Sequence, residues 1–241
     1  MASSLRQLEV RRLGTVEYGE ARALQLDLVQ ERYASRIPDT LLLLQHPPVI
    51  TLGIKGDGGR SNILATGETL AALGVQVHEA GRGGDVTYHG PGQIVGYPIL
   101  DLRPDRCDVH RYVRDVEEVM IRVCGDYGLA AGRIKGMTGT WLDADSPRAA
   151  KIGAIGVRIS RWITSHGFAF NVSTELDRFA LIVPCGLAGQ GVTSLEQATG
   201  RRIPLAEVED AFVRHFAIVF ERVMTASPTP RPASDVTSIR T

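Results

Sequence analysis

The chain contains the stretch Arg82-Gly83-Gly84-Asp85-Val86-Thr87-Tyr88-His89-Gly90-Pro91-Gly92-Gln93, which runs into the apolar sequence Gln93-Ile94-Val95-Gly96-Tyr97-Pro98-Ile99-Leu100. Five of the twelve residues from Arg82 to Gln93 are glycine or proline, so the backbone stays open there and can lie close to a bound molecule. The apolar sequence predicts a buried strand, and binding loops are commonly mounted on such rigid elements. A glycine-rich surface turn is the alternative interpretation.

The glycine-rich stretch does not match the known phosphate-binding loops. It lacks the lysine and the Ser/Thr that end a P-loop, and its glycines do not fit the dinucleotide fingerprint that opens a helix. Its polar side chains, above all Arg82, Thr87 and His89, can orient a ligand. We therefore expect a binding loop, with no support for a nucleotide site.

Composition bounds the class of protein. The 241 residues are 44% hydrophobic and 22% charged, which is typical of a globular protein with a well-buried core. Basic and acidic residues number 27 each, so no bulk attraction to nucleic acid or to an anionic membrane follows. No apolar run is long enough for a signal peptide or a membrane span. We expect a cytoplasmic protein with neither nucleic-acid nor membrane partners.

Apolar spacing along the chain predicts one α/β domain with a mixed sheet, over residues 10–225. The predicted helices are residues 18–36, 109–127 and 204–224, the last with Val223 on its buried face. The predicted strands, apart from residues 93–100, are residues 40–44, 49–52, 151–160 and 163–172. Residues 226–241 are rich in Ser, Thr and Pro and predict a disordered tail.

The three cysteines, Cys107, Cys124 and Cys185, have no paired spacing, and the histidines are scattered, so neither a disulfide framework nor a metal site is indicated. Cys124 lies on the apolar stripe of a predicted helix and is assigned to the core. Cys185 stands in Pro184-Cys185-Gly186, where the glycine leaves a backbone N–H free to point at an oxyanion. Cys185 is therefore either a reactive thiol or a small buried residue in a turn.

Lys151 is one of three lysines and opens the apolar sequence Lys151-Ile152-Gly153-Ala154-Ile155-Gly156. It is either an exposed residue at a strand end or a buried amine with a functional role. An ammonium group close to Cys185 would favour the thiolate. His89 and His166 are candidates for general bases or for histidines satisfied by backbone partners, and His46, before two prolines, is predicted to be structural.

Together these motifs resemble the octanoyl/lipoyl transferase family, within the superfamily of biotin and lipoate protein ligases. The resemblance is carried, in the family's order, by His46-Pro47-Pro48 through Gly53, by residues 82–93 with Tyr97, by Lys151-Ile152-Gly153-Ala154-Ile155-Gly156, by His166-Gly167-Phe168-Ala169-Phe170-Asn171 and by Pro184-Cys185-Gly186. It covers roughly residues 10–220. Gly153 and Phe168 stand where related sequences often carry other small or aliphatic residues, a difference that bears on pocket shape.

The resemblance implies an α/β fold of the α+β type, with a mixed sheet flanked by helices. It also implies an acyltransferase of lipoate biosynthesis that moves an octanoyl or lipoyl group. The donor would be octanoyl-acyl carrier protein, and the acceptors would be lysines on lipoyl domains of 2-oxoacid dehydrogenase complexes and on the glycine cleavage H protein. Cys185 would carry the acyl group as a thioester, with Lys151 as its dyad partner. No cofactor and no metal is implied.

The resemblance further implies an acyl pocket lined by Arg82, Gly83, Gly84, Asp85, Val86, Thr87, Tyr88, His89, Ala154, Ile155, Gly156, Gly167, Phe168 and Ala169. Two alternatives remain. An ATP-dependent lipoate or biotin protein ligase of the same fold would have no need of a nucleophilic cysteine. A non-catalytic protein that binds an acyl carrier would form no thioester. ATP dependence and covalent trapping distinguish the three.

Overall fold

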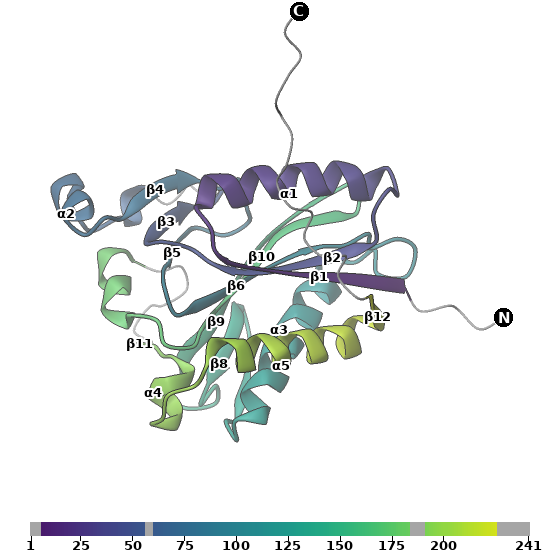
Figure 1. Ribbon diagram of the computed structural model, residues 1–241. Helices are drawn as coiled ribbons and strands as arrows, with labels where there is room; N and C mark the ends of the chain where they lie inside the picture. The colour runs from purple at the N-terminus through teal and green to yellow at the C-terminus, as the bar shows by residue number, and fades with distance from the viewer. Residues whose placement is uncertain (1–5, 56–59, 184–190, 226–241) are drawn as a thin grey trace, which may run out of the picture.

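The computed structural model describes residues 6–55, 60–183 and 191–225. Within them a large mixed sheet has the strand order β12-β1-β2-β6-β10-β9-β8-β7, with β11 paired to β9 (Figure 1). Its strands are β1 (Arg6–Thr15), β2 (Asp39–Gln45), β6 (Gln93–Ile99), β7 (Ala131–Ile134), β8 (Met137–Leu142), β9 (Ala150–Ser160), β10 (Ile163–Asn171), β11 (Gly191–Val192) and β12 (Arg222–Thr225). A small sheet has the order β4-β3-β5, made of β3 (Val49–Leu52), β4 (Gln76–Glu79) and β5 (Val86–His89).

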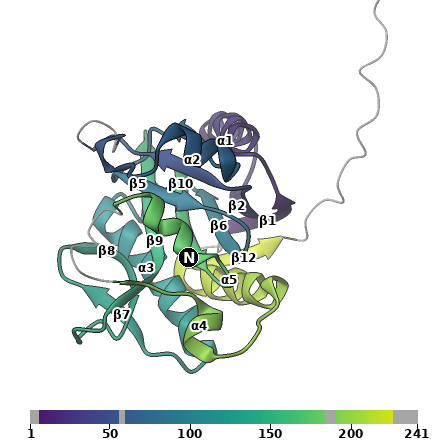
Figure 2. The same cartoon turned by 90° about the vertical axis from the view of Figure 1, so that its left-hand side faces the viewer.

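Helices cover both faces of the large sheet. Helix α1 (Tyr18–Tyr33) lies on one face, and α3 (Val109–Asp126) and α5 (Leu205–Phe220) pack together on the other. Figure 2 shows the small sheet and the short α2 (Gly67–Ala72) on the side of α1, with α4 (Leu195–Thr199) near α5. Short 3₁₀ helices occupy Arg60–Asn62 and Leu176–Leu181. The expected mixed sheet flanked by helices is confirmed.

The centre of the sheet is buried on both faces, which explains the unbroken apolar run in β2. Leu41 and Leu43 face the core beneath α3 and α5, while Leu42 and Leu44 face the core beneath α1, and all four are fully buried. This division follows from the two-residue period of a strand. A run without polar alternation is therefore what a central strand between two helical layers requires.

Helix α3 has the expected amphipathic pattern and a polar start. The Asp108 side chain accepts hydrogen bonds from the backbone N–H groups of His110 and Arg111, which caps the helix. Cys124 is fully buried in the core shared with α5, and burial raises the pKa of its thiol to about 12. Its assignment to the core is confirmed.

Three predictions of element bounds are wrong. The first helix ends at Tyr33 instead of residue 36, and Ser35 just beyond it adopts a left-handed conformation (φ 56°). The last helix ends at Phe220 because Glu221 adopts a left-handed conformation (φ 55°), and the chain then forms β12 beside β1. Val223 is consequently 48% exposed instead of buried. Within the glycine-rich stretch, Val86–His89 is strand β5, which pairs with β3 instead of remaining an open loop.

Some expectations concern residues beyond the described ranges. The predicted tail, residues 226–241, lies outside them, and so does Cys185. Among the helices that are described, none combines the length and the apolar character needed to cross a membrane.

A buried carboxylate joins α1, β2 and β12. The fully buried Asp39 accepts hydrogen bonds from Arg32 Nε at 2.7 Å, from Arg222 Nε at 2.8 Å and from the backbone N–H of Asp101 at 3.0 Å. The Arg222 side chain is itself 2% exposed. Removing one partner from such a group leaves an uncompensated buried charge.

We expect Asp39→Asn to lower the free energy of unfolding by about 3 to 5 kcal/mol, because the Arg222 guanidinium then lies buried without its counter-ion. Urea unfolding followed by circular dichroism measures this change. Glu31→Gln is the control, since Glu31 pairs with Arg36 at the surface and should leave the unfolding midpoint nearly unchanged. Equal effects of the two substitutions would contradict the structural role of Asp39.

Candidate functional site

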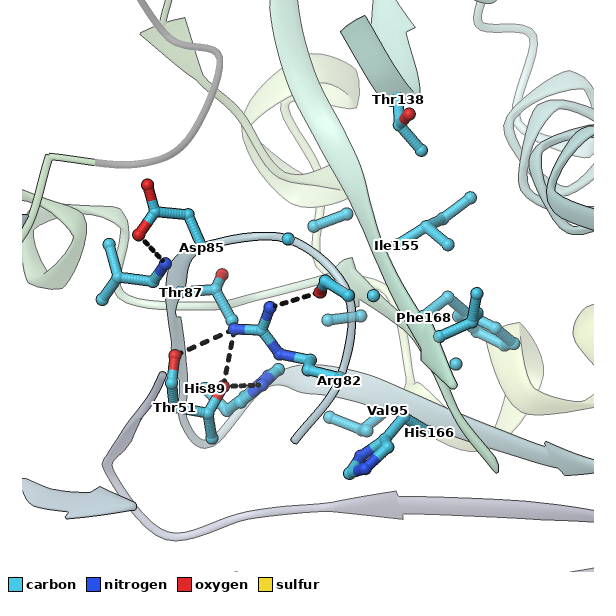
Figure 3. A pocket seen from close by; sticks show the side chains of 18 of the residues that line it. Thr51, Arg82, Asp85, Thr87, His89, Val95, Thr138, Ile155, His166 and Phe168 are labelled. Carbon is cyan, nitrogen blue, oxygen red and sulfur yellow. Dashed lines mark hydrogen bonds between the residues drawn. The ribbon is translucent and has the colours of Figure 1, made fainter. Parts of the chain in front are cut away.

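A cavity of about 450 Å³ lies between the large sheet and the segment that carries β5 (Figure 3). Strands β9 and β10 form one wall, through residues 154–157 and 166–169, and residues 82–87 with His89 form the opposite wall. The volume falls in the range of about 300 to 1,000 Å³ that small-molecule sites occupy. The lining combines small and apolar residues of the sheet with a few polar groups from the glycine-rich segment.

The structure gathers at this cavity most residues that the sequence nominated. Lys151 lines it together with Arg82, Gly83, Gly84, Asp85, Val86, Thr87, His89, Ala154, Ile155, Gly156, Gly167, Phe168 and Ala169. Tyr88 is the exception among the proposed pocket residues. It alternates with Thr87 and His89 along β5, so its ring points into the core of the small sheet, where it packs against Phe179 with centroids 5.7 Å apart.

Other lining residues were not proposed from the sequence. They are Tyr18, Thr51, Lys55, Val95, Tyr97, Val113, Gly136, Met137, Thr138, Val157, Phe179 and Val192, together with His166, for which the sequence suggests only a general base or a histidine satisfied by backbone partners. Tyr97 belonged to a recognised motif and offered a signal. The residues from the β7–β8 turn and from α3 did not, because only long-range packing brings them here.

Arg82 and Gly83 together fasten the glycine-rich segment to both sheets. Arg82 Nη2 donates to the Thr51 carbonyl oxygen at 2.8 Å and to Thr51 Oγ1 at 3.0 Å, as Figure 3 shows. The backbone N–H of Gly83 donates to the Val157 carbonyl oxygen at 2.9 Å. A Cβ at Gly156 would lie 2.7 Å from Arg82 Cδ, so only glycine leaves room for this close approach.

A chain of buried hydrogen bonds, here called the buried relay, continues from Thr51 through His89, Gln93 and Asn171 to Thr193. Thr51 Oγ1 lies 3.3 Å from His89 Nε2, and His89 Nδ1 lies 2.7 Å from Gln93 Oε1. Gln93 Nε2 donates to Asn171 Oδ1 at 2.9 Å, and Asn171 Nδ2 donates to the Thr193 carbonyl oxygen at 3.0 Å. Because Gln93 Oε1 can only accept, His89 carries its proton on Nδ1, and every bond runs in one direction.

The buried relay ends beside Lys151. The backbone N–H of Thr193 donates to the Lys151 carbonyl oxygen at 3.0 Å, and Val192 pairs with Lys151 between β11 and β9. Lys151 is the second residue of β9 and is half-buried, with its Nζ 4.6 Å from the centroid of the Trp141 ring. The glycine-rich segment and the surroundings of Lys151 thus belong to one connected structure.

The histidines around the cavity are neutral. Burial lowers the pKa of His89 to about 3, and burial lowers the pKa values of His46 and His166 to about 4. His46 bonds to the Val16 carbonyl oxygen and to the Tyr97 hydroxyl, which agrees with the structural role expected for it. His89 is held at both ring nitrogens, so the geometry favours a hydrogen-bonding role for it over that of a general base.

The described residues include no group of three or more His, Cys, Asp or Glu side chains placed to hold a metal ion. The residues with polar side chains that line the cavity are instead arginine, lysine, threonine, aspartate, tyrosine and neutral histidine. Such a set can orient an ester or thioester carbonyl and can move protons through Lys151.

Comparison with known proteins identifies relatives over most of the chain. The model of the lipoyl protein ligase A/B catalytic domain matches residues 17–217. An octanoyltransferase of Myxococcus xanthus is 50% identical over 224 residues, which cover 92% of this chain but only 62% of that protein. An octanoyltransferase of Koribacter versatilis is 50% identical over 216 residues, which cover 89% of this chain and 84% of that protein.

A solved structure gives the same fold. The bi-partite lipoate protein ligase of Thermoplasma acidophilum, studied with its E2 lipoyl domain, aligns with a TM-score of 0.68 over 95% of this chain and 89% of that chain. The two sequences are 14% identical, so this likeness concerns the fold alone. The family resemblance seen in the motifs and the fold that it implied are both confirmed.

The neutral buried histidines predict a pH dependence of stability. Their folded pKa values lie below the unfolded value of about 6.5, so stability is full above that value and falls as pH drops from about 6.5 toward 4. Each histidine contributes up to about 1.4 kcal/mol per pH unit. Urea unfolding between pH 7 and pH 5 measures the slope, and His89→Gln should reduce it by about a third. A flat profile in this interval would contradict the neutral state of these histidines.

Proposed function

The chain belongs to the octanoyltransferase family, with the lipoyl protein ligase A/B catalytic domain over residues 17–217, and from this membership we propose its specific reaction. It transfers an octanoyl group from acyl carrier protein to the ε-amine of a lysine on a lipoyl domain. The observation that carries this proposal is the cavity of about 450 Å³, which brings half-buried Lys151 together with thirteen residues nominated for an acyl pocket.

The character of the cavity supports an acyl substrate. The side chains of Val95, Ile155, Phe168 and Ala169 give it apolar walls that can take up a hydrocarbon chain. Lys151 lines the same cavity and is the amine that the proposed chemistry requires. The histidines of the cavity are neutral and do not compete with it as cations.

In the first step Cys185, as the thiolate, attacks the carbonyl carbon of the octanoyl thioester. A new carbon–sulfur bond forms to Cys185, the bond to the carrier's sulfur breaks, and Lys151 gives its proton to the departing thiolate. A nearby ammonium group also favours the thiolate of Cys185 before attack, so the two groups titrate as a pair. Support for their proximity comes from β11, six residues after Cys185 in the sequence, which pairs with β9 at Lys151.

In the second step the ε-amine of the acceptor lysine attacks the acyl-enzyme. An amide bond forms, the bond to Cys185 breaks, and neutral Lys151 takes up the proton that the amine loses, which restores the starting ion pair. Exchange between thioesters is nearly neutral in energy and conversion of a thioester to an amide is downhill. The reaction therefore needs no ATP, in agreement with a loop that matches no phosphate-binding motif.

The partners follow from the same proposal. The acceptors are lipoyl domains of 2-oxoacid dehydrogenase complexes and the glycine cleavage H protein, and the reaction takes place in the cytoplasm. The competing proposal, an ATP-dependent ligase of the same fold, draws on a structural likeness at 14% sequence identity. The octanoyltransferases are similar at 50% identity, which favours transfer without nucleotide.

We expect the purified chain to octanoylate a lipoyl domain from octanoyl-acyl carrier protein without ATP. Lys151→Arg should lower this rate by about 10²- to 10⁴-fold, because arginine keeps the charge but cannot release a proton. Initial rates give the transfer defect, and the pH dependence of Cys185 alkylation reports the electrostatic effect separately. Cys124→Ala serves as the control and should retain transfer. A strict need for ATP, or an arginine variant as fast as the parent, would contradict the proposal.

The cavity also predicts a chain-length optimum, set in part by Phe168. This ring lines the cavity and stacks on Phe212 with centroids 4.9 Å apart. Phe168→Leu should enlarge the cavity beside this residue and move the optimum to longer chains, because each buried methylene is worth about 0.8 kcal/mol until the chain meets an obstacle. Transfer rates with carrier-bound chains of six to twelve carbons measure the optimum.

Phe170→Leu is the matched control for that experiment. Phe170 lies on the same strand, belongs to the same core and also contacts Phe212, but it does not line the cavity. Its substitution should lower stability and leave the chain-length optimum in place. An optimum that stays at the same length in the Phe168 variant would show that the acyl chain does not reach this ring.

A further inference from the structure

A buried tryptophan lies directly beside Lys151. Trp141 on β8 pairs with Lys151 on β9, and paired residues on neighbouring antiparallel strands project from the same face of the sheet. Trp141 is fully buried, and Lys151 Nζ lies 4.6 Å from the centroid of its ring. An ammonium group within about 6 Å of an aromatic face is attracted by the electron density of the ring.

An irregularity in the sheet creates this pairing. Thr140 pairs with Gly153, but the next residue, Trp141, pairs with Lys151, so β9 contains one extra residue at this point. In a regular ladder Ile152 would stand opposite Trp141. Because Ile152 is fully buried in the main core, the bulge lets it remain there while the lysine is turned toward the indole. Bulges of this kind often re-aim a side chain beside an active site.

Hydrogen bonds hold Trp141 and the strand β8 that carries it in place. Its Nε1–H donates to the Met137 carbonyl oxygen at 3.2 Å. The backbone N–H of Gly139 donates to Oε1 of the buried Glu117 on α3 at 3.0 Å. Gly139 has φ 125°, and a Cβ there would lie 2.5 Å from the Gly153 carbonyl oxygen and 3.4 Å from Lys151 Cε. Only glycine fits at this position, because a Cβ would clash with the Gly153 carbonyl on the neighbouring strand β9.

We propose that Trp141 is a positioning residue that holds the ammonium group of Lys151 over its indole face. Lysine has a long flexible side chain, and an aromatic surface with a fixed orientation restricts where its nitrogen can lie. The bulge in β9 and the hydrogen bonds to the Met137 carbonyl and to Glu117 serve the same end, since they fix the ring and the strand β8 that carries it. The consequence for transfer rests on the proposed role of Lys151, whereas the contact itself does not.

Fluorinated tryptophan tests the contact almost without a change of shape. The chain has two tryptophans, and the other, Trp162, is 36% exposed in the turn between β9 and β10. In the Trp162→Phe background, 5-fluorotryptophan labels position 141 alone and gives one ¹⁹F resonance. We expect Lys151→Met, which removes the charge at similar length, to shift this resonance. In the matched Trp141→Phe background, the label at position 162 should not respond to Lys151→Met.

Progressive fluorination then tests the positioning role. Each added fluorine withdraws electron density from the ring face, so mono-, di- and tetrafluoro-tryptophan at position 141 should slow octanoyl transfer in that order. The total loss should lie between about twofold and thirtyfold, the range set by the strength of such contacts. Thermal unfolding of each labelled protein controls for loss of packing, and Trp141→Phe should retain more transfer than Trp141→Leu.

The outcomes separate this inference from the proposed function. If the ¹⁹F resonance at position 141 does not shift in Lys151→Met, the proposed contact is wrong, whatever the transfer activity. A shifted resonance with a flat fluorination series overturns the positioning role. If Lys151→Met shifts the resonance but leaves transfer intact, the contact stands and the catalytic role of Lys151 fails instead. A shift together with a graded loss of rate supports both.

Discussion

A line of buried hydrogen bonds connects the segment that carries Arg82 to the strand that carries Lys151. Arg82 binds Thr51, and the buried relay passes from there through His89 and Gln93 toward Thr193, which bonds to the backbone of Lys151. The line crosses from the small sheet to the large one, so the two walls of the cavity cannot shift independently. Since each buried polar group in it has its partner, loss of one member leaves another unsatisfied.

This constraint explains why the histidines near the cavity act as structural groups. His89 is a donor on one side and an acceptor on the other, and protonation would turn that acceptor into a second donor facing the Thr51 hydroxyl. Burial keeps its pKa low and the relay intact. In the proposed reaction, proton transfer falls to Lys151, which lies at the far end of the relay, between the bulge in β9 and the face of Trp141.

Much of this arrangement could be predicted from the sequence, because motifs and periodicity are local. The strand at residues 93–99 and the helix at 109–126 followed from such signals, and the family resemblance implied that residues 82–87 and 154–156 line one cavity. The direction of the Tyr88 side chain could not be predicted, because residues 86–89 form a strand only through their pairing with β3, which is distant in the sequence. Likewise Trp141 gave no signal, since its closeness to Lys151 depends on a bulge that sequence periodicity does not reveal.

The central claim is that an octanoyl group passes through a thioester on Cys185. Intact-mass spectrometry of the full chain, after incubation with octanoyl-loaded carrier protein and without ATP or acceptor, tests it most directly. The account predicts one octanoyl group, mapped to Cys185, that hydroxylamine removes and that a lipoyl domain discharges as amide. An adduct on Cys107 or Cys124 would contradict it, and so would transfer to the lipoyl domain without any detectable acyl-enzyme.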